Sequence, residues 1–336
     1  MKGAASPGKD ASPPAVVEGA KARPVAKAVD SITKSLVAHV DSLATACGAH
    51  AILVYADAIA AEDLSLLEGG GCRVFCVTKA PQHKPHQEEE SKEEGRHFIH
   101  VPNVPLSRFG QVKIAVFMAL MEGLVSRGDI LVCLSGFTGS GTLDTLVVTE
   151  VGSEFEMLAP LETDEESSTD AGAEVIERVL EVATSLGSQG REGKHVGAIF
   201  VVGDTTRVLS MSRPLILNPF SGHAEEDRNI LDKGLEETIK EFSSIDGAFV
   251  VRGDGVIESC GVLLKTAGQD AFELPRGLGA RHHAAAGITA VTRATAVTVS
   301  QSTGNVMIFR GGKAILEVEK IRSGGIHARG TDPGSG

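Results

Sequence analysis

The chain has 336 residues, of which 42% are hydrophobic, and its formal net charge is −12. This length suits about two domains, each with enough apolar residues for an ordinary core. The acidic balance argues against a duplex nucleic-acid partner, because such proteins present a basic face. It leaves phosphorylated small molecules open, since a phosphate site needs only local positive charge.

No apolar run approaches the roughly 18 residues that span a bilayer, and the N-terminal segment lacks the apolar stretch of a secretory signal. We therefore expect a cytoplasmic protein without a membrane partner, beginning with a disordered Ala-, Pro- and Lys-containing arm at residues 1–28. No C-x-x-C motif occurs, which predicts reduced thiols at the five cysteines, Cys47, Cys72, Cys76, Cys133 and Cys260.

Residues 29–155 alternate between strand and helix patterns. Strands are predicted at 51–55, 73–77, 98–101, 129–134 and 145–151. Helices are predicted from a cap at Asp30 or Ser31 to Gly48, near 60–68 and near 108–126, and residues 79–97 form a polar, exposed excursion. Such alternation predicts βαβ units and a mostly parallel sheet covered on both faces.

The end of this region, GDILVCLSGFTGSGTLDTLVVTEV, is similar to the last segment of the pyruvate kinase C-terminal domain. The likeness concerns fold and pattern and brings no catalytic residues with it, because a fold alone does not determine function.

Residues 156–170 are acidic and Ser-rich, which predicts a linker, and residues 171–322 form a second domain followed by a disordered tail at 323–336. A helix at 173–186 belongs either to the linker or to the second domain. We expect a hairpin of strands 196–203 and 207–211 through Gly203-Asp204, and a helix near 225–242. Two strands follow within 248–264, and residues 296–318 close the sheet.

Two short elements in this second domain carry candidate chemistry. Asp246-Gly247-Ala248 opens a strand, so a carboxylate beside small residues can reach a metal or a ribose. Arg281 and His282 begin a predicted helix, where free backbone N–H groups and a guanidinium both favour phosphate. An acid and a cationic cluster at opposite ends of one small sheet suit a nucleoside triphosphate and its metal. The alternatives are a solvated Asp in a turn and an ordinary capped surface helix.

These motifs resemble the DGA and RHR signatures of the diadenylate cyclase domain, and residues 300–304, SQSTG, stand where that family has S-E-E-T-G. The resemblance covers roughly residues 195–318, and the whole chain resembles archaeal diadenylate cyclases of the DacZ type. It implies an α/β fold whose second domain has a mixed sheet flanked by helices. It also implies condensation of two ATP into cyclic di-AMP and two pyrophosphates.

The resemblance further implies a role for each matching residue. Asp246 would bind a divalent metal, Mn²⁺ or Mg²⁺, and assist the ribose 3′-hydroxyl, whereas Arg281 and His282 would act on the triphosphate. Leu263 would contact adenine, although its pattern alone indicates a core leucine. The implied ATP-binding set is Asp246, Gly247, Leu263, Gly279, Ala280, Arg281, His282, His283 and Ser300. Because each domain would hold one ATP, a face-to-face homo-oligomer is implied.

Four positions, which make three departures, differ from the family pattern. Ala280 replaces a Ser or Thr, His283 replaces the second Arg, and Gln301-Ser302 replace two glutamates. The changes remove a hydroxyl, a permanent positive charge and two carboxylates, and His is mostly neutral at pH 7. They leave open an alternative, a nucleotide-binding sensor of the same fold without turnover.

Two other patterns in the sequence could bind a ligand or a metal. The glycine-rich stretch 135–141 follows a strand and could form an anion-binding nest, but it lacks the Lys of a Walker A loop. It leaves open a different phosphotransferase, a regulatory ligand or a flexible loop. Four histidines flank an acidic run and indicate either a metal site or a solvated loop: His83, His86, His97 and His100.

Overall fold

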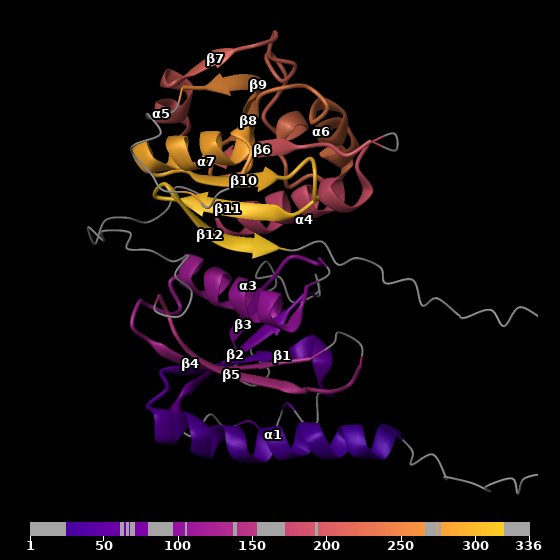
Figure 1. Ribbon diagram of the computed structural model, residues 1–336, viewed down its shortest axis with the longest axis vertical. Coiled ribbons are helices and arrows are strands. Elements are labelled where there is room, and N and C mark those ends of the chain that lie inside the picture. The colour runs from indigo at the N-terminus through magenta and orange to yellow at the C-terminus, as the bar shows by residue number, and fades with distance from the viewer. Residues whose placement is uncertain are drawn as a thin grey trace, which may run out of the picture.

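The computed structural model describes residues 25–60, 64, 67, 71–79, 97–104, 106–136, 140–152, 172–191, 194–265, 274 and 277–318. Two sheets organise these residues, one of five strands and one of seven. Figure 1 shows the two sheets one above the other, each with its own helices. The predicted arm before residue 25, helix residues 61–63, excursion residues 80–96, linker 156–170 and tail lie outside the described residues.

The first sheet has the order β3-β2-β1-β4-β5, with β1 to β4 parallel and β5 antiparallel to β4. Its elements are α1 (Val25–Cys47), β1 (Ala51–Tyr55), η1 (Ala56–Ala58), β2 (Arg73–Thr78), β3 (His97–His100), α3 (Arg108–Met121), β4 (Ile130–Ser135) and β5 (Thr145–Glu150). The central strand β1 is buried throughout, as its unbroken apolar run requires. The mostly parallel sheet is therefore confirmed.

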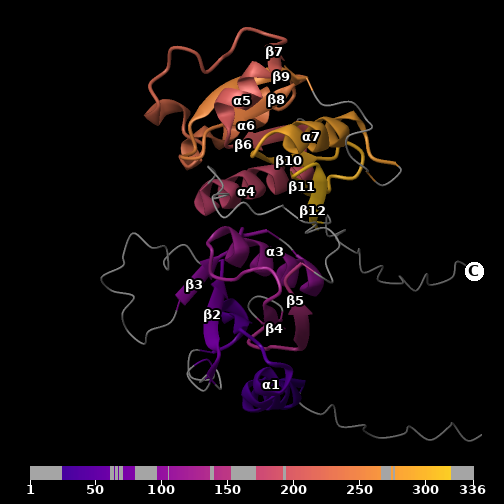
Figure 2. The ribbon, with the colours of Figure 1, turned by 90° about the vertical axis from the view of Figure 1, so that its left-hand side faces the viewer.

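Helix α1 begins earlier than predicted. It starts at Val25, so Asp30 and Ser31 lie inside the helix and do not cap it. Its end before Gly48 is confirmed, because that glycine adopts a left-handed φ of 67°. Thr33 fastens the helix to the sheet domain, since its hydroxyl accepts a hydrogen bond from Leu143 N at 3.0 Å. Figure 2 shows α1 on the side of the first sheet away from the second, and α3 on the side toward it.

The second sheet has the order β12-β11-β10-β6-β8-β9-β7, and only β6 and β8 pair in parallel among its described strands. Its elements are α4 (Ala173–Gln189), β6 (Ala198–Val202), α5 (Thr205–Ser210), β7 (Ser212–Pro214), η5 (Glu226–Arg228), η6 (Lys233–Leu235), α6 (Glu236–Phe242), β8 (Ala248–Val251), β9 (Ile257–Leu264), α7 (Ala280–Val291), β10 (Thr295–Val299), β11 (Val306–Arg310) and β12 (Lys313–Val318).

Helices cover both faces of this mixed sheet. Alternate residues of β6 enter two separate cores, with Phe200 in the core that contains α4 and Val201 in the core that contains α7. Helix α4 contacts β6, β10 and β11, so it is the second sheet's own packing layer and not part of a linker. The α/β class, with a mixed sheet flanked by helices, is confirmed.

The predicted hairpin through Gly203-Asp204 is wrong. Residues 205–210 form α5, because β6 is a central strand whose two edges are already occupied by β8 and β10. Asp204 makes the reversal in a left-handed conformation with φ of 43°. The polypeptide then returns as β7, which pairs with the distant strand β9.

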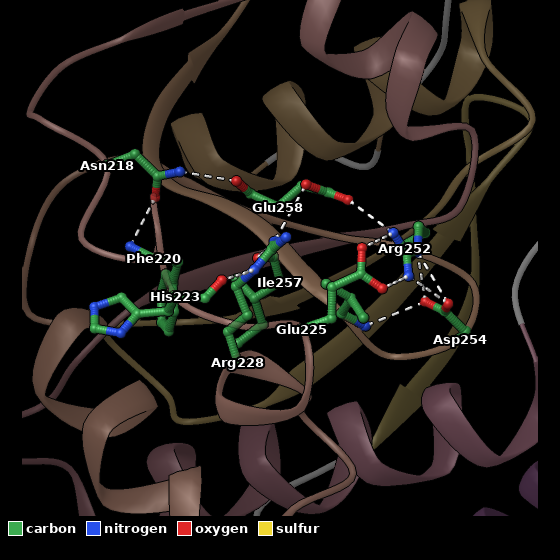
Figure 3. A network of polar contacts seen from close by, with 10 residues as sticks. Asn218, Phe220, His223, Glu225, Arg228, Arg252, Asp254, Ile257 and Glu258 are labelled. Atoms are coloured by element: carbon green, nitrogen blue, oxygen red, sulfur yellow. Dashed lines mark hydrogen bonds and ion pairs between the residues drawn. The ribbon is translucent and has the colours of Figure 1, made fainter.

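The predicted helix at 225–242 forms only at its end, as α6. Asn229 bridges to Val256 in antiparallel fashion, which requires extended backbone where the helix was expected. A charged network holds this segment on β8 and β9 (Figure 3): Arg252 bonds Glu225 and Glu258. These contacts with distant strands outweigh the local helical pattern.

None of the helices among the described residues is both long enough and apolar enough to cross a bilayer.

Candidate functional site

Asp246 and Arg281 meet at one end of the strands of the second sheet. The Arg281 side chain donates from Nη2 to Asp246 Oδ1 at 3.3 Å and from Nη1 to Gln301 Oε1 at 3.2 Å. Asp246 precedes β8, Arg281 lies in the first turn of α7, and Gln301 follows β10. The acid and the cation therefore lie at the same end of the sheet, and the expectation of opposite ends is wrong.

Gly247 explains why the Asp246 side chain is presented outward. Its φ is 114°, and a Cβ there would lie 2.6 Å from the backbone carbon of Gly261. Only glycine tolerates this conformation and this close approach to β9. The Asp246 side chain just before it is 91% exposed, so the carboxylate is accessible to a ligand.

Gly197, which the sequence analysis missed, provides space for the guanidinium. A Cβ at this position would lie 2.8 Å from Arg281 Nη1 and 3.1 Å from the Gln301 Cβ. The only signal in the sequence is a glycine directly before the apolar run of β6, which is typical of close backbone approach. Arg281 is thus confined between Asp246, Gln301 and the backbone at the start of β6.

His282 points its polar edge into a buried environment. The residue is 6% exposed, and its Nδ1 has no hydrogen-bond partner among the described residues. Burial lowers the pKa of His282. The nearby Glu317 opposes this shift, whereas His283 and Arg281 add to it. Burial therefore favours the neutral imidazole, and a buried nitrogen without a partner is uncommon in a folded protein.

A pocket of about 500 Å³ lies beside these residues. It is lined by residues 277–282 at the start of α7, residues 299–303 after β10, and Asn305, Met307 and Glu317. Its volume is in the range that holds small ligands. The N-cap residue of α7 is Gly279, which has no side chain to cap the helix, so the N-terminal backbone suits an anion.

The pocket brings together five of the predicted residues, which are Gly279, Ala280, Arg281, His282 and Ser300. Asp246 joins them through its contact with Arg281. Gly247 follows Asp246 in the sequence, and His283 follows the lining residue His282. Leu263 does not line the pocket. It lies on β9 opposite Arg213 of β7, where it is 41% exposed, so its contact with adenine stays a prediction.

Asp246 can supply one ligand to a divalent cation. Among the described residues no group of three or more His, Cys, Asp and Glu side chains could hold a metal. A single exposed carboxylate nevertheless fits Mg²⁺ or Mn²⁺, because such ions commonly use one or two carboxylates together with substrate phosphates. The donor set at this end of the sheet therefore suits an ion shared with a phosphorylated ligand.

The two other candidate patterns gain no support from the described residues. His97 and His100 lie on β3 without a metal-binding cluster, while His83 and His86 fall outside the description. In the glycine-rich stretch, residues 137–139 are also outside it.

Comparison with known proteins identifies both parts of the chain. A family model described as "DisA bacterial checkpoint controller nucleotide-binding" matches residues 185–314, and "Probable sensor domain DacZ_P" matches residues 33–159. The diadenylate cyclase of Haloferax volcanii is 37% identical over 235 residues, which cover 68% of this chain and 82% of that protein. This chain belongs to the diadenylate cyclase family.

The diadenylate cyclase of Methanocaldococcus jannaschii is 44% identical over 179 residues, which cover 53% of this chain and 56% of that relative. Among solved structures, a double mutant of DacA from Staphylococcus aureus is 22% identical with a TM-score of 0.27, covering 42% of this chain and 83% of that one. The likeness of the first domain to pyruvate kinase stays a prediction.

Gly197→Ala tests the confinement of Arg281. The added methyl group would displace the guanidinium, so the affinity for ATP should fall about tenfold, the loss expected for one charge-assisted hydrogen bond. Isothermal titration with ATP measures this change. Gly234→Ala, in η6 and outside the pocket, is the control and should bind like the parent. Unchanged affinity in Gly197→Ala would show that the close approach does not position Arg281.

Proposed function

We propose that the chain condenses two molecules of ATP into cyclic di-AMP and two pyrophosphates. The observation that carries this proposal is the direct contact of Arg281 with Asp246 at the pocket, within a chain of the diadenylate cyclase family. An acid for the ribose or metal and a cation for the phosphates are thereby adjacent, as one bound nucleotide requires.

In the proposed reaction, the 3′-hydroxyl of one ATP attacks the α-phosphorus of the other. A new P–O bond forms, the bond to the pyrophosphate oxygen breaks, and the hydroxyl proton departs; a second, equivalent attack closes the ring. The Arg281 guanidinium and the uncapped start of α7 bind the phosphates. Asp246 assists the hydroxyl, and the fixed positions of these groups supply much of the acceleration.

Asp246 would also hold the divalent cation, Mn²⁺ or Mg²⁺, jointly with the ATP phosphates. When bound, the ion neutralises charge on the transferring phosphoryl group. Among the described residues, the exposed Asp246 carboxylate pairs with Arg281 at 3.3 Å. Exposed ion pairs of this kind are weak, about 0–1 kcal/mol, so this pair can open as nucleotide and metal bind.

One departure from the family pattern, Gln301, is compatible with turnover. Gln301 replaces a glutamate, yet its amide oxygen still accepts a hydrogen bond from Arg281. Because Gln301 is neutral, it leaves more of the guanidinium's positive charge for phosphate. The sensor without turnover remains the alternative, and it predicts ATP binding without product.

We propose that two copies face each other to complete the site. Leu217 is 94% exposed and Leu215 is 42% exposed on the segment after β7. Leu215 N donates to Gly261 O at 2.8 Å, and Gly261 is the residue against which Gly247 packs. An apolar rim next to an exposed carboxylate suits a two-fold contact, which would bring each 3′-hydroxyl to the other copy's ATP.

We propose a two-domain layout, which the family matches to residues 33–159 and 185–314 support in outline. Residues 29–155 form the first domain, residues 156–170 the linker and residues 171–322 the cyclase domain. Cytoplasmic localisation, with ATP supplied there as substrate, is part of the same proposal.

Asp246→Asn tests the proposed chemistry directly. Removing the charge that would hold metal and assist the hydroxyl should lower cyclic di-AMP production at least 100-fold, measured by mass spectrometry after incubation with ATP and Mn²⁺ or Mg²⁺. The melting temperature should stay unchanged because the side chain is exposed. Asp227→Asn, an exposed acid of η5, should retain activity. Product at the parental rate in Asp246→Asn would reject the assignment.

Dilution tests the shared site. Specific activity should fall when the protein concentration drops below the dissociation constant of the assembly. Leu217→Ser should move this fall to a protein concentration at least tenfold higher. Leu209→Ser, a half-exposed leucine of α5 away from Asp246, is the matched control. Analytical ultracentrifugation should report the same shift. Specific activity that stays constant while the protein dissociates into monomers would contradict a site shared between copies.

A further inference from the structure

We infer that Glu317 is a positioning residue of the nucleotide site, acting from β12 through Asn305 on the turn of residues 300–305. The inference rests on the proposed nucleotide function of this pocket. It concerns a residue outside the three sequence motifs and two strands away from Ser300, so no spacing in the sequence indicates it.

Glu317 holds the last residue of the turn. Its Oε1 accepts a hydrogen bond from Asn305 Nδ2 at 2.9 Å. Asn305 is in turn bonded along the backbone, since its carbonyl oxygen accepts from Ser300 N at 2.9 Å and its own N donates to Thr303 Oγ1 at 3.2 Å. One carboxylate on a regular strand therefore fixes the residue that closes the turn.

The strand register places this carboxylate in the pocket. Glu317 lies opposite Met307 in the antiparallel pair of β11 and β12, and both residues line the pocket together with Asn305. A sheet position of this kind is more rigid than a loop position. The turn itself lacks the two glutamates of the family pattern, so in this chain the acid of the pocket comes from a neighbouring strand.

The turn connects Glu317 to the reacting groups. Gln301, within the turn, accepts from Arg281, which also contacts Asp246. A displaced turn would therefore move the partner that orients the guanidinium. Glu317 also acts on His282, the buried imidazole of the pocket: it opposes the lowering of the His282 pKa by burial, His283 and Arg281. The first effect orients the guanidinium for phosphate.

Five variants, one of them a control, test the inference, with ATP affinity measured by isothermal titration and turnover by product formation. Glu317→Ala should raise both the Kd and the KM for ATP about tenfold, as expected from losing a hydrogen bond to a charged group, while kcat changes less than threefold. Glu317→Gln should restore the Kd to within threefold, because its amide oxygen still accepts from Asn305. Glu241→Gln, on the exposed face of α6, should match the parent.

Asn305→Ala separates positioning from a purely structural effect. It should reproduce the Kd of Glu317→Ala, and the double variant should be no weaker than either single variant, since both remove the same contact. If Glu317→Ala fails to fold, the Kd of Asn305→Ala decides the inference.

An unchanged Kd in folded Glu317→Ala, additive losses in the double variant, or no rescue by Glu317→Gln would overturn the role of Glu317. The titration does not require turnover. A parent that binds ATP without making cyclic di-AMP would reject the proposed function, and the Kd values of the variants would still decide the inference.

Discussion

The hydrogen-bonded ion pair of Arg281 with Asp246 joins two segments 35 positions apart in the chain. It depends on glycines, because Gly247 lets the strand pass against β9 and Gly197 leaves room for the guanidinium. The pair is exposed and contributes little to folding stability. Its importance is that a cation and an acid are held within reach of one ligand while each can exchange its partner for phosphate or metal.

The elements around this pair come from the topology of the second sheet. Strands β6 and β8 begin at the end of the sheet where the pair lies, and the antiparallel β10 ends there, so the residues flanking these strands converge. Strand β12 also contacts α3 of the first domain, and Arg310 at the end of β11 donates to Met121 Sδ at 3.5 Å. The outermost strand β12, which carries Glu317, thus adjoins both the pocket and the domain that matches a probable sensor.

Sequence reasoning succeeded where local pattern determines structure. Unbroken apolar runs located the strands of the first sheet, and the motifs at Asp246 and Arg281 identified two groups that are in contact. It failed where distant pairing decides: β6 had no free edge for residues 207–211, and Asn229 pairs with Val256 in place of forming a helix. Positioning residues such as Gly197 and Glu317 carry no motif, because only the sheet register brings them to the site.

The most direct test of the account is a crystal structure of the protein with Mn²⁺ and an ATP analogue that cannot lose pyrophosphate. The account predicts one nucleotide per chain that touches the Arg281 guanidinium with its phosphates and the Asp246 carboxylate with its ribose or shared metal. A second chain should present its nucleotide to the first. A nucleotide bound elsewhere, or one that reaches only one of these two side chains, would contradict it.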